Sequence, residues 1–185
     1  ILKHMSLSIV GTEENAGVTA CLNYIIGRLR DSGTRIAITS IGIDGENVDQ
    51  VTKTHKPEIE IYPGTLFTTS ENHYRTRTII SEILNISKQS TSLGRLVTAR
   101  AKSRGKLIFS GPTSTMWIKD IIAEMQGYGS QLTIIDGALS RKSLGSPSVT
   151  DCMILSTGAA VSHDANELIR KTKFVYNLIN IEAYE

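Results

Sequence analysis

The sequence predicts an α/β fold in which a mostly parallel sheet is flanked by helices. Short apolar segments typical of buried strands alternate with segments whose apolar residues recur at helical spacing. At the start of the chain, a strand, a glycine-containing loop, a helix and a second strand follow one another over residues 6–40. A helix between two apolar strands indicates a parallel pair with a right-handed connection. No internal repeat or low-complexity segment interrupts this alternation.

The composition limits the classes of function. The chain has 185 residues, 40% hydrophobic and 21% charged, which is ordinary for a globular domain with its own core. The net charge is +2 and no dense block of Lys and Arg occurs, so we expect no nucleic-acid partner. No apolar run approaches the roughly 20 residues that a membrane helix needs, so we expect no membrane association.

The chain ends and the cysteines bear on domain organisation and compartment. We interpret residues 1–5 as an expression remnant followed by the natural start at Met5, and residues 6–185 as one α/β domain. Cys21 and Cys152 lie in apolar segments, which is typical of small core residues in a reducing compartment. We therefore expect a cytoplasmic protein.

The first third of the chain contains clear elements. We predict strands at 6–10 and 35–40, with a helix at 19–31 between them whose apolar face is Leu22, Ile25, Ile26 and Leu29. Residues 41–57 are polar and rich in glycine, which predicts a long loop. Residues 57–62 alternate as an edge strand does.

The middle of the chain is less distinct. In residues 65–92, Ile79, Ile80, Ile83 and Leu84 fit a helix, and the Thr and Ser residues before them fit a loop or a helix cap. Residues 93–101 and 106–110 flank Ser103-Arg104-Gly105, which predicts a β-hairpin inserted into the α/β fold.

The last part returns to the alternating pattern. A helix is predicted to begin at residues 111–113, with Ile118, Ile121, Ile122 and Met125 facing inward. Further elements are predicted as strands at 131–136 and 151–156, a helix at 165–172 capped by Asp164, and a last strand at 174–181.

The loop between the first strand and the first helix has the frame of a phosphate site. Gly11, Gly17 and Thr19 form a G-x5-G-x-T pattern. Such a loop directs backbone N–H groups and the positive end of a helix at one point, which favours an anion whatever the side chains are. The predicted phosphate-binding residues are Gly11, Thr12, Glu13, Asn15, Ala16, Gly17, Val18 and Thr19.

Three residues could contribute to a Mg²⁺ site beside this loop. The Thr19 hydroxyl lies where such a group joins the metal shell. Asp136 ends an apolar strand, as does the acid that orders water around a nucleotide-bound metal. Asp44 follows the second strand and could contact metal or water, but Asp44-Gly45 is also a common turn pair.

Val18 occupies the position where such loops carry a lysine. That lysine makes a charge-assisted bond to the terminal phosphates, a class of bond that contributes roughly 1.5–3 kcal/mol. Its absence should lower nucleotide affinity by about one to two decades. Glu13 and Glu14 add negative charge beside the site. We predict weak or absent ATP hydrolysis and leave weak nucleotide binding open.

Three motifs together resemble a known family. They resemble the SIMIBI branch of P-loop NTPases, which includes dethiobiotin synthetase and other dimeric nucleotide switches. The motifs are SIVGTEENAGVTACLNYI, ITSIGIDGE and LTIIDGALSRKS. The loop form GT-x4-G-x-T is similar to that of dethiobiotin synthetase. The longer combination is similar to proteins associated with reactivation of cobalamin-dependent lysine and ornithine aminomutases. The resemblance is specific at these motifs and vague over residues 57–105.

The resemblance implies ligands and partners. It carries Gly11, Thr12, Gly17 and Thr19 over as phosphate-site positions and Asp136 as the acid on the metal side. The cofactor implied is ATP or another nucleotide with Mg²⁺. The implied assembly is a homodimer that works with a larger enzyme, such as a cobalamin-dependent aminomutase, or with a second reactivase subunit.

Three functions are compatible with these motifs. The first is a nucleotide-binding or degenerate nucleotide-binding regulatory subunit of a reactivating factor. The second is an ATP-dependent small-molecule ligase similar to dethiobiotin synthetase; Val18 weighs against it, because that chemistry activates a carbamate with the γ-phosphate. The third is an interaction protein that has the fold and binds no nucleotide.

Overall fold

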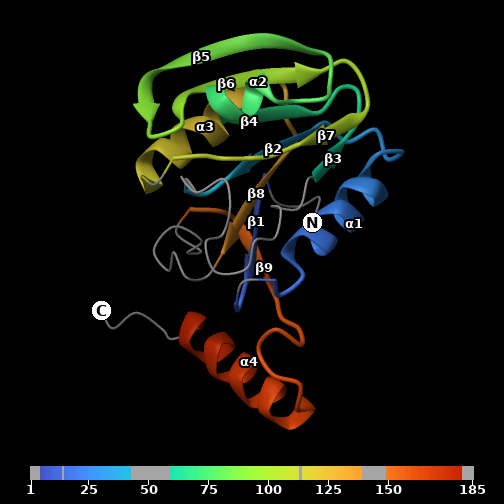
Figure 1. Cartoon of the computed structure of the whole chain (residues 1–185), viewed down its shortest axis with the longest axis vertical. Coiled ribbons are helices and arrows are strands. Elements are labelled where there is room, and N and C mark those ends of the chain that lie inside the picture. The colour runs from blue at the N-terminus through green and yellow to red at the C-terminus, as the bar shows by residue number, and fades with distance from the viewer. Residues whose placement is uncertain (1–4, 14, 43–58, 113, 139–148, 181–185) are drawn as a thin grey trace.

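The computed structural model describes residues 5–13, 15–42, 59–112, 114–138 and 149–180. In that part of the chain, one sheet has seven strands in the order β5-β6-β4-β2-β8-β1-β9 (Figure 1). Neighbours from β4 to β9 pair in parallel, and β6 and β5 extend the sheet antiparallel. The strands are β1 (Ser6–Gly11), β2 (Ile36–Ser40), β4 (Leu66–Ser70), β5 (Ser81–Thr91), β6 (Gly94–Ala101), β8 (Leu132–Ala138) and β9 (Cys152–Ser156). The predicted α/β class with a mainly parallel sheet is confirmed.

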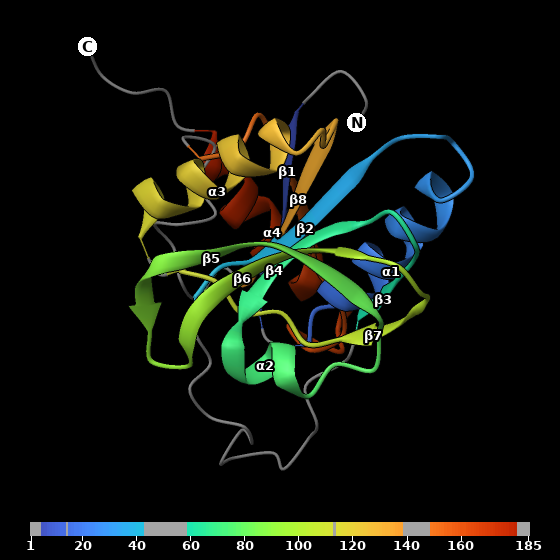
Figure 2. The same ribbon diagram turned by 90° about the horizontal axis from the view of Figure 1, so that it is seen from above.

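Helices cover both faces of this sheet. The helices are α1 (Val18–Leu29), α2 (Glu71–Arg75), α3 (Thr115–Gly127) and α4 (Ala165–Ile179). On β8, Ile134 packs in the cluster that contains the apolar face of α1, whereas its neighbour Ile135 packs against Ile118 of α3. Successive strand residues point to opposite faces, so α1 and α3 lie on opposite sides of the sheet (Figure 2).

The two predicted inward helix faces are confirmed. In α1, Leu22, Ile25 and Ile26 are buried. The face predicted for α3 is buried as well, and it consists of Ile118, Ile121, Ile122 and Met125. Helical spacing predicted these faces correctly because each helix packs one side against the sheet, and the apolar residues of that side are the ones removed from water.

The helix predicted from Ile79, Ile80, Ile83 and Leu84 is wrong. Ile79 and Ile80 directly precede β5, and Ile83 and Leu84 lie in it; β5 pairs antiparallel with β6. β5 lies at the edge of the sheet and has no fully buried residue; Ile83 and Ile86 are 49% and 38% exposed. The spacing of isoleucines therefore does not reflect one buried face, and β-branched residues fit the extended chain that β6 pairs with.

The predicted hairpin has a different partner. Residues 93–101 form a strand as expected, but it turns back on β5 instead of pairing with residues 106–110. The short strand β7 (Gly105–Leu107) pairs antiparallel with β3 (Ile59–Ile61), which lies within the predicted edge strand 57–62. Turn residues between two apolar runs were compatible with either pairing, and long-range contacts selected one.

The strand predicted at 174–181 is also wrong, because α4 continues to Ile179. The predicted cap is confirmed: the Asp164 carboxylate accepts a hydrogen bond from the Glu167 N–H at 2.7 Å. Leu168, Thr172, Val175 and Ile179 are half-buried at helical spacing. Residues 174–179 therefore belong to a helix with one half-buried face.

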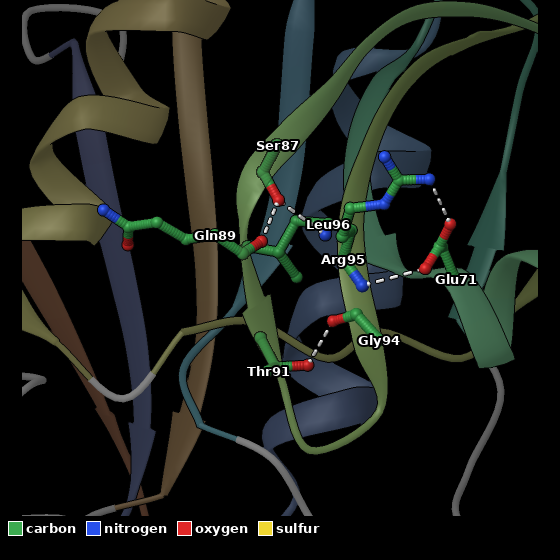
Figure 3. A network of polar contacts seen from close by, with 7 residues as sticks. All are labelled: Glu71, Ser87, Gln89, Thr91, Gly94, Arg95 and Leu96. Atoms are coloured by element: carbon green, nitrogen blue, oxygen red, sulfur yellow. Dashed lines mark hydrogen bonds and ion pairs between the residues drawn. The ribbon is translucent and has the colours of Figure 1, made fainter.

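A polar network connects the β5–β6 hairpin to α2 (Figure 3). The Glu71 carboxylate accepts a hydrogen bond from the Arg95 N–H at 3.0 Å and pairs with the Arg95 guanidinium at 3.0 Å. Within the hairpin, the Thr91 hydroxyl donates to the Gly94 carbonyl at 2.7 Å and the Leu96 N–H donates to the Ser87 hydroxyl at 2.9 Å. These bonds fix the end of the hairpin at which β5, a strand with no fully buried residue, turns into β6.

The Glu71 interaction predicts a pH dependence of stability. The Arg95 N–H and guanidinium hold the pKa of Glu71 below its usual range. A lowered pKa stabilises the fold above the unfolded value of about 4.3 and loses that contribution as pH falls through the folded value. The Glu71→Gln variant should therefore be less stable than the wild type at neutral pH, and the difference should disappear as the pH falls through the folded pKa of Glu71.

Urea unfolding at several pH values checks this expectation. Asp120→Asn is the matched control, since no ion pair or hydrogen bond of the Asp120 side chain occurs with the residues described. This control removes a carboxylate without removing such a contact. A Glu71→Gln difference that does not change with pH would contradict the role of the Arg95 contact.

Candidate functional site at the carboxyl edge of the sheet

The loop between β1 and α1 turns back sharply. Asn15 and Gly17 have φ values of 59° and 87°, in the left-handed region that asparagine and glycine adopt most readily. The Ala16 N–H donates to the Glu13 carbonyl at 3.3 Å, which closes a tight turn before the helix. The predicted positions of the glycines thus correspond to a real change of chain direction.

β9 holds this loop from one side. The Thr12 N–H donates to the Ser156 carbonyl at 2.9 Å, and the Ser156 hydroxyl donates to the Ala16 carbonyl at 2.7 Å. The Thr12 hydroxyl lies 3.3 Å from the same Ser156 carbonyl and 3.1 Å from the Thr157 hydroxyl. Sequence reasoning missed Ser156, because its role depends on β9 lying next to β1.

Helix α1 begins after Gly17, which cannot cap the helix with a side chain. The first N–H groups of a helix have no intrahelical acceptor and carry the positive end of the helix dipole. Thr19 lies in this first turn and is half-buried. The chemistry that the turn offers is therefore backbone donation to an anion.

Val18 packs as an apolar residue. It is half-buried against the core cluster beneath α1. A Cβ atom on Gly11 would lie 2.8 Å from the Val18 Cγ2 and 2.9 Å from the Glu13 carbonyl oxygen, so the start of the loop is tightly packed. The position of the expected lysine thus supplies packing and no charge.

Asp136 lies on the same face of the sheet as α1. In β8 it is two residues beyond Ile134, which packs in the core cluster under α1. It is level with Ile9 of β1 and Ser40 of β2, and it is half-buried. The structure therefore brings Asp136 and the glycine loop to the same edge of two neighbouring strands. Asp44 and Glu14 lie outside the described residues.

The strand order makes this edge a topological switch point. From β1 the chain passes through α1 to β2, on the far side of β8. From β8 it passes to β9, on the far side of β1. The connections of these two neighbouring strands therefore leave in opposite directions. Open α/β sheets bind ligands in the crevice outside the carboxyl ends of such strands.

The residues present fit a phosphate ligand better than an isolated metal ion. Within the described ranges, no group of three or more His, Cys, Asp and Glu residues is placed to hold a metal. A Mg²⁺ ion bound through nucleotide phosphates needs only one or two protein ligands, which Asp136 and Thr19 could supply. The loop offers backbone donors for phosphate, and Val18 leaves it without the usual cation.

The two cysteines contribute no reactive thiolate. Cys21 in α1 and Cys152 in β9 are both half-buried, and burial raises the pKa of each thiol. Thiols with raised pKa values stay protonated at neutral pH and are poor nucleophiles. Their packing beside the core agrees with the structural role predicted for them.

A cavity of about 360 Å³ lies between the glycine loop and α4. Sequence reasoning did not predict it, because it treated residues 174–181 as a strand. Its walls come from the loop, from the turn after β9 and from one face of α4. The lining residues are Thr12, Glu13, Val161, Arg170, Lys171, Phe174 and Val175.

No protein-family model, curated protein or solved structure matches this chain. The resemblance to the SIMIBI branch therefore stays a prediction. Among the described helices, none is both long and apolar enough to cross a membrane.

Proposed function

We propose that this chain is a P-loop-type nucleotide-binding regulatory subunit. The observation that carries the proposal is the placement of the glycine loop and Asp136 at the carboxyl ends of β1 and β8, the neighbouring strands whose connections leave in opposite directions. A loop that turns into an uncapped helix favours phosphate, and an acid on the neighbouring strand favours the metal that accompanies it.

Regulation is favoured over catalysis by the chemistry of the loop. Val18 packs against the core and Gly11, and Glu13 is exposed beside the same loop. A catalyst of phosphoryl transfer depends on positive charge at the terminal phosphates. A subunit that binds nucleotide without hydrolysing it needs less positive charge at the terminal phosphates. We therefore rank the ATP-dependent ligase below the regulator and keep a nucleotide-free interaction protein as the third candidate.

The partner in this proposal rests on the sequence resemblance. We propose a homodimer that acts with a larger enzyme, such as a cobalamin-dependent aminomutase, or with a second reactivase subunit. Nucleotide state would then control how the larger enzyme handles its cofactor.

Calorimetric titration with ATP and ADP, with and without Mg²⁺, tests nucleotide binding. We expect saturable binding at up to millimolar concentrations that Mg²⁺ strengthens. The Asp136→Asn variant should lose the strengthening by Mg²⁺ and keep the metal-independent part. Asp120→Asn, on α3 at the other face of the sheet, should behave as the wild type.

The alternatives predict other results. No heat and no thermal shift with millimolar nucleotide would reject the regulator and the ligase and leave the interaction protein, since a ligand that binds the folded state must raise its apparent stability. An Asp136→Asn variant with an unchanged response to Mg²⁺ would remove Asp136 from the site.

A further inference from the structure

The cavity between the glycine loop and α4 has charged groups on two separate walls. The loop contributes Glu13, and α4 contributes Arg170 and Lys171. Lys171 already has two partners: its ammonium pairs with the Glu167 carboxylate at 3.0 Å and donates to the Val161 carbonyl at 3.3 Å. Lys171 therefore anchors α4 to the turn after β9 and adds little net charge to the cavity.

Glu13 and Arg170 have no direct polar partner in the part of the chain that the structure describes. The pKa of Glu167, on the same helix as Arg170, is lowered first by its hydrogen bond with Lys171, and the Arg170 charge contributes to that lowering. Among the described residues, the Glu13 carboxylate and the Arg170 guanidinium make no hydrogen bond and no ion pair, with each other or with any neighbour. They have opposite charges, come from segments far apart in the sequence and line one cavity. A ligand with one charge would meet one of them favourably and the other unfavourably.

Apart from Thr12, the rest of the lining is apolar. Phe174 and Val175 of α4 and Val161 of the preceding turn also line the cavity. The volume of about 360 Å³ is in the range of small-molecule sites, which combine an apolar lining with a few polar groups that orient the ligand. Phe174 is 64% exposed, so a ligand here would also cover apolar surface.

We propose that this cavity binds a small amino acid-like zwitterion. Its amino group pairs with Glu13, its acid group pairs with Arg170, and its apolar body lies against Phe174 and Val175. This site shares Thr12 and Glu13 with the loop predicted to bind phosphate. It is tested with ligands that carry no phosphate, so it can fail while the nucleotide proposal stands, and the reverse.

Three probes of similar shape separate the two charges. L-Phenylalanine carries both, 3-phenylpropanoate carries only the acid group, and 2-phenylethylamine carries only the amino group. Each is titrated at neutral pH and low salt into ¹⁵N-labelled protein, and the amide shifts of Thr12, Glu13 and Phe174 are followed. Both charged side chains are exposed, so each matched charge should tighten binding about two- to fivefold. L-Phenylalanine should therefore bind tightest.

Variants assign each charge to its partner. Glu13→Gln should weaken L-phenylalanine and 2-phenylethylamine but not 3-phenylpropanoate. Arg170→Gln should weaken L-phenylalanine and 3-phenylpropanoate but not 2-phenylethylamine. Phe174→Ala should weaken all three. Lys173→Gln is the matched control, since Lys173 lies on α4 but does not line the cavity, and it should change none.

Clear results would overturn the proposal. One is the absence of saturable shifts at these amides with any probe at tens of millimolar. Another is 3-phenylpropanoate binding as tightly as L-phenylalanine, which would indicate a plain anion site. Equal effects of Arg170→Gln and Lys173→Gln would also overturn it. The ligand would then respond to the net positive charge of α4 and not to an ion pair with Arg170. Amide spectra of each free variant verify that it is folded.

Discussion

Replacing Gly111 with alanine should lower the free energy of unfolding by about 3 kcal/mol or more. A Cβ atom on Gly111 would lie 1.7 Å from the Ser40 carbonyl oxygen and 2.8 Å from the Ser40 carbonyl carbon. Both contacts are with backbone, so no side chain can rotate away. The Gly111 N–H also donates to the Gly42 carbonyl at 3.2 Å, and the Gly42 N–H donates to the Pro112 carbonyl at 2.9 Å. The two segments could separate only by breaking these bonds.

Gly27→Ala is the matched control for this substitution. Gly27 lies inside α1, and a Cβ atom there would meet nothing within 4 Å. Alanine should raise the free energy of unfolding by about 0.5–1 kcal/mol, because it favours the helix over the unfolded chain. Urea unfolding followed by far-UV circular dichroism measures both variants. A Gly111→Ala variant within about 1 kcal/mol of the wild type would show that the Ser40 backbone is not held against Gly111.

Replacing Val18 with lysine should tighten ATP binding by about tenfold. The new ammonium would supply the charge-assisted bond to the terminal phosphates that the loop lacks. The unbranched lysine stem also has one γ-carbon where valine has two, so packing beside Gly11 changes as well. Calorimetric titration with ATP and Mg²⁺ measures the change, and the gain should shrink as salt concentration rises.

Val18→Met separates the charge from the shape. Methionine is also unbranched and apolar, so it makes the same change in packing without the ammonium. It should leave ATP affinity close to that of the wild type. If neither variant binds ATP more tightly, the backbone donors of this loop do not face a phosphate, and the proposed nucleotide site fails.

The elements that could be predicted from sequence are those whose signal is local. The segments that became β1, α1, β2, α3, β8 and β9 combine apolar runs or helical spacing with glycine or polar ends. All but β9 are packed in the centre of the sheet or directly on it, so their buried pattern is continuous. β9 lies at an edge and is half-buried throughout. The glycine loop and Asp136 were located for the same reason, because they follow directly from such strands.

The two wrong elements lie at the periphery. β5 is an edge strand, and α4 has no fully buried residue. Ile83 in the first and Phe174 in the second are 49% and 64% exposed. Where apolar residues are not all directed to one core, their spacing does not distinguish a strand from a helix. Pairing with β6 decided the first case, and contacts of α4 with the turn after β9 decided the second.

The chain's local pattern was sufficient to predict the α/β class, the turn after the first strand and the acid at the end of β8. Which strands are neighbours was decided only when the whole chain packed. Thr12 and Ser156 are separated by 144 positions, yet their hydrogen bond holds the glycine loop. The cavity lined by Glu13 and Arg170 also depends on β9 lying next to β1, because the loop after β1 and the helix after β9 form its walls. Strand order follows from how distant apolar faces are buried together, and that contribution to the free energy is non-local.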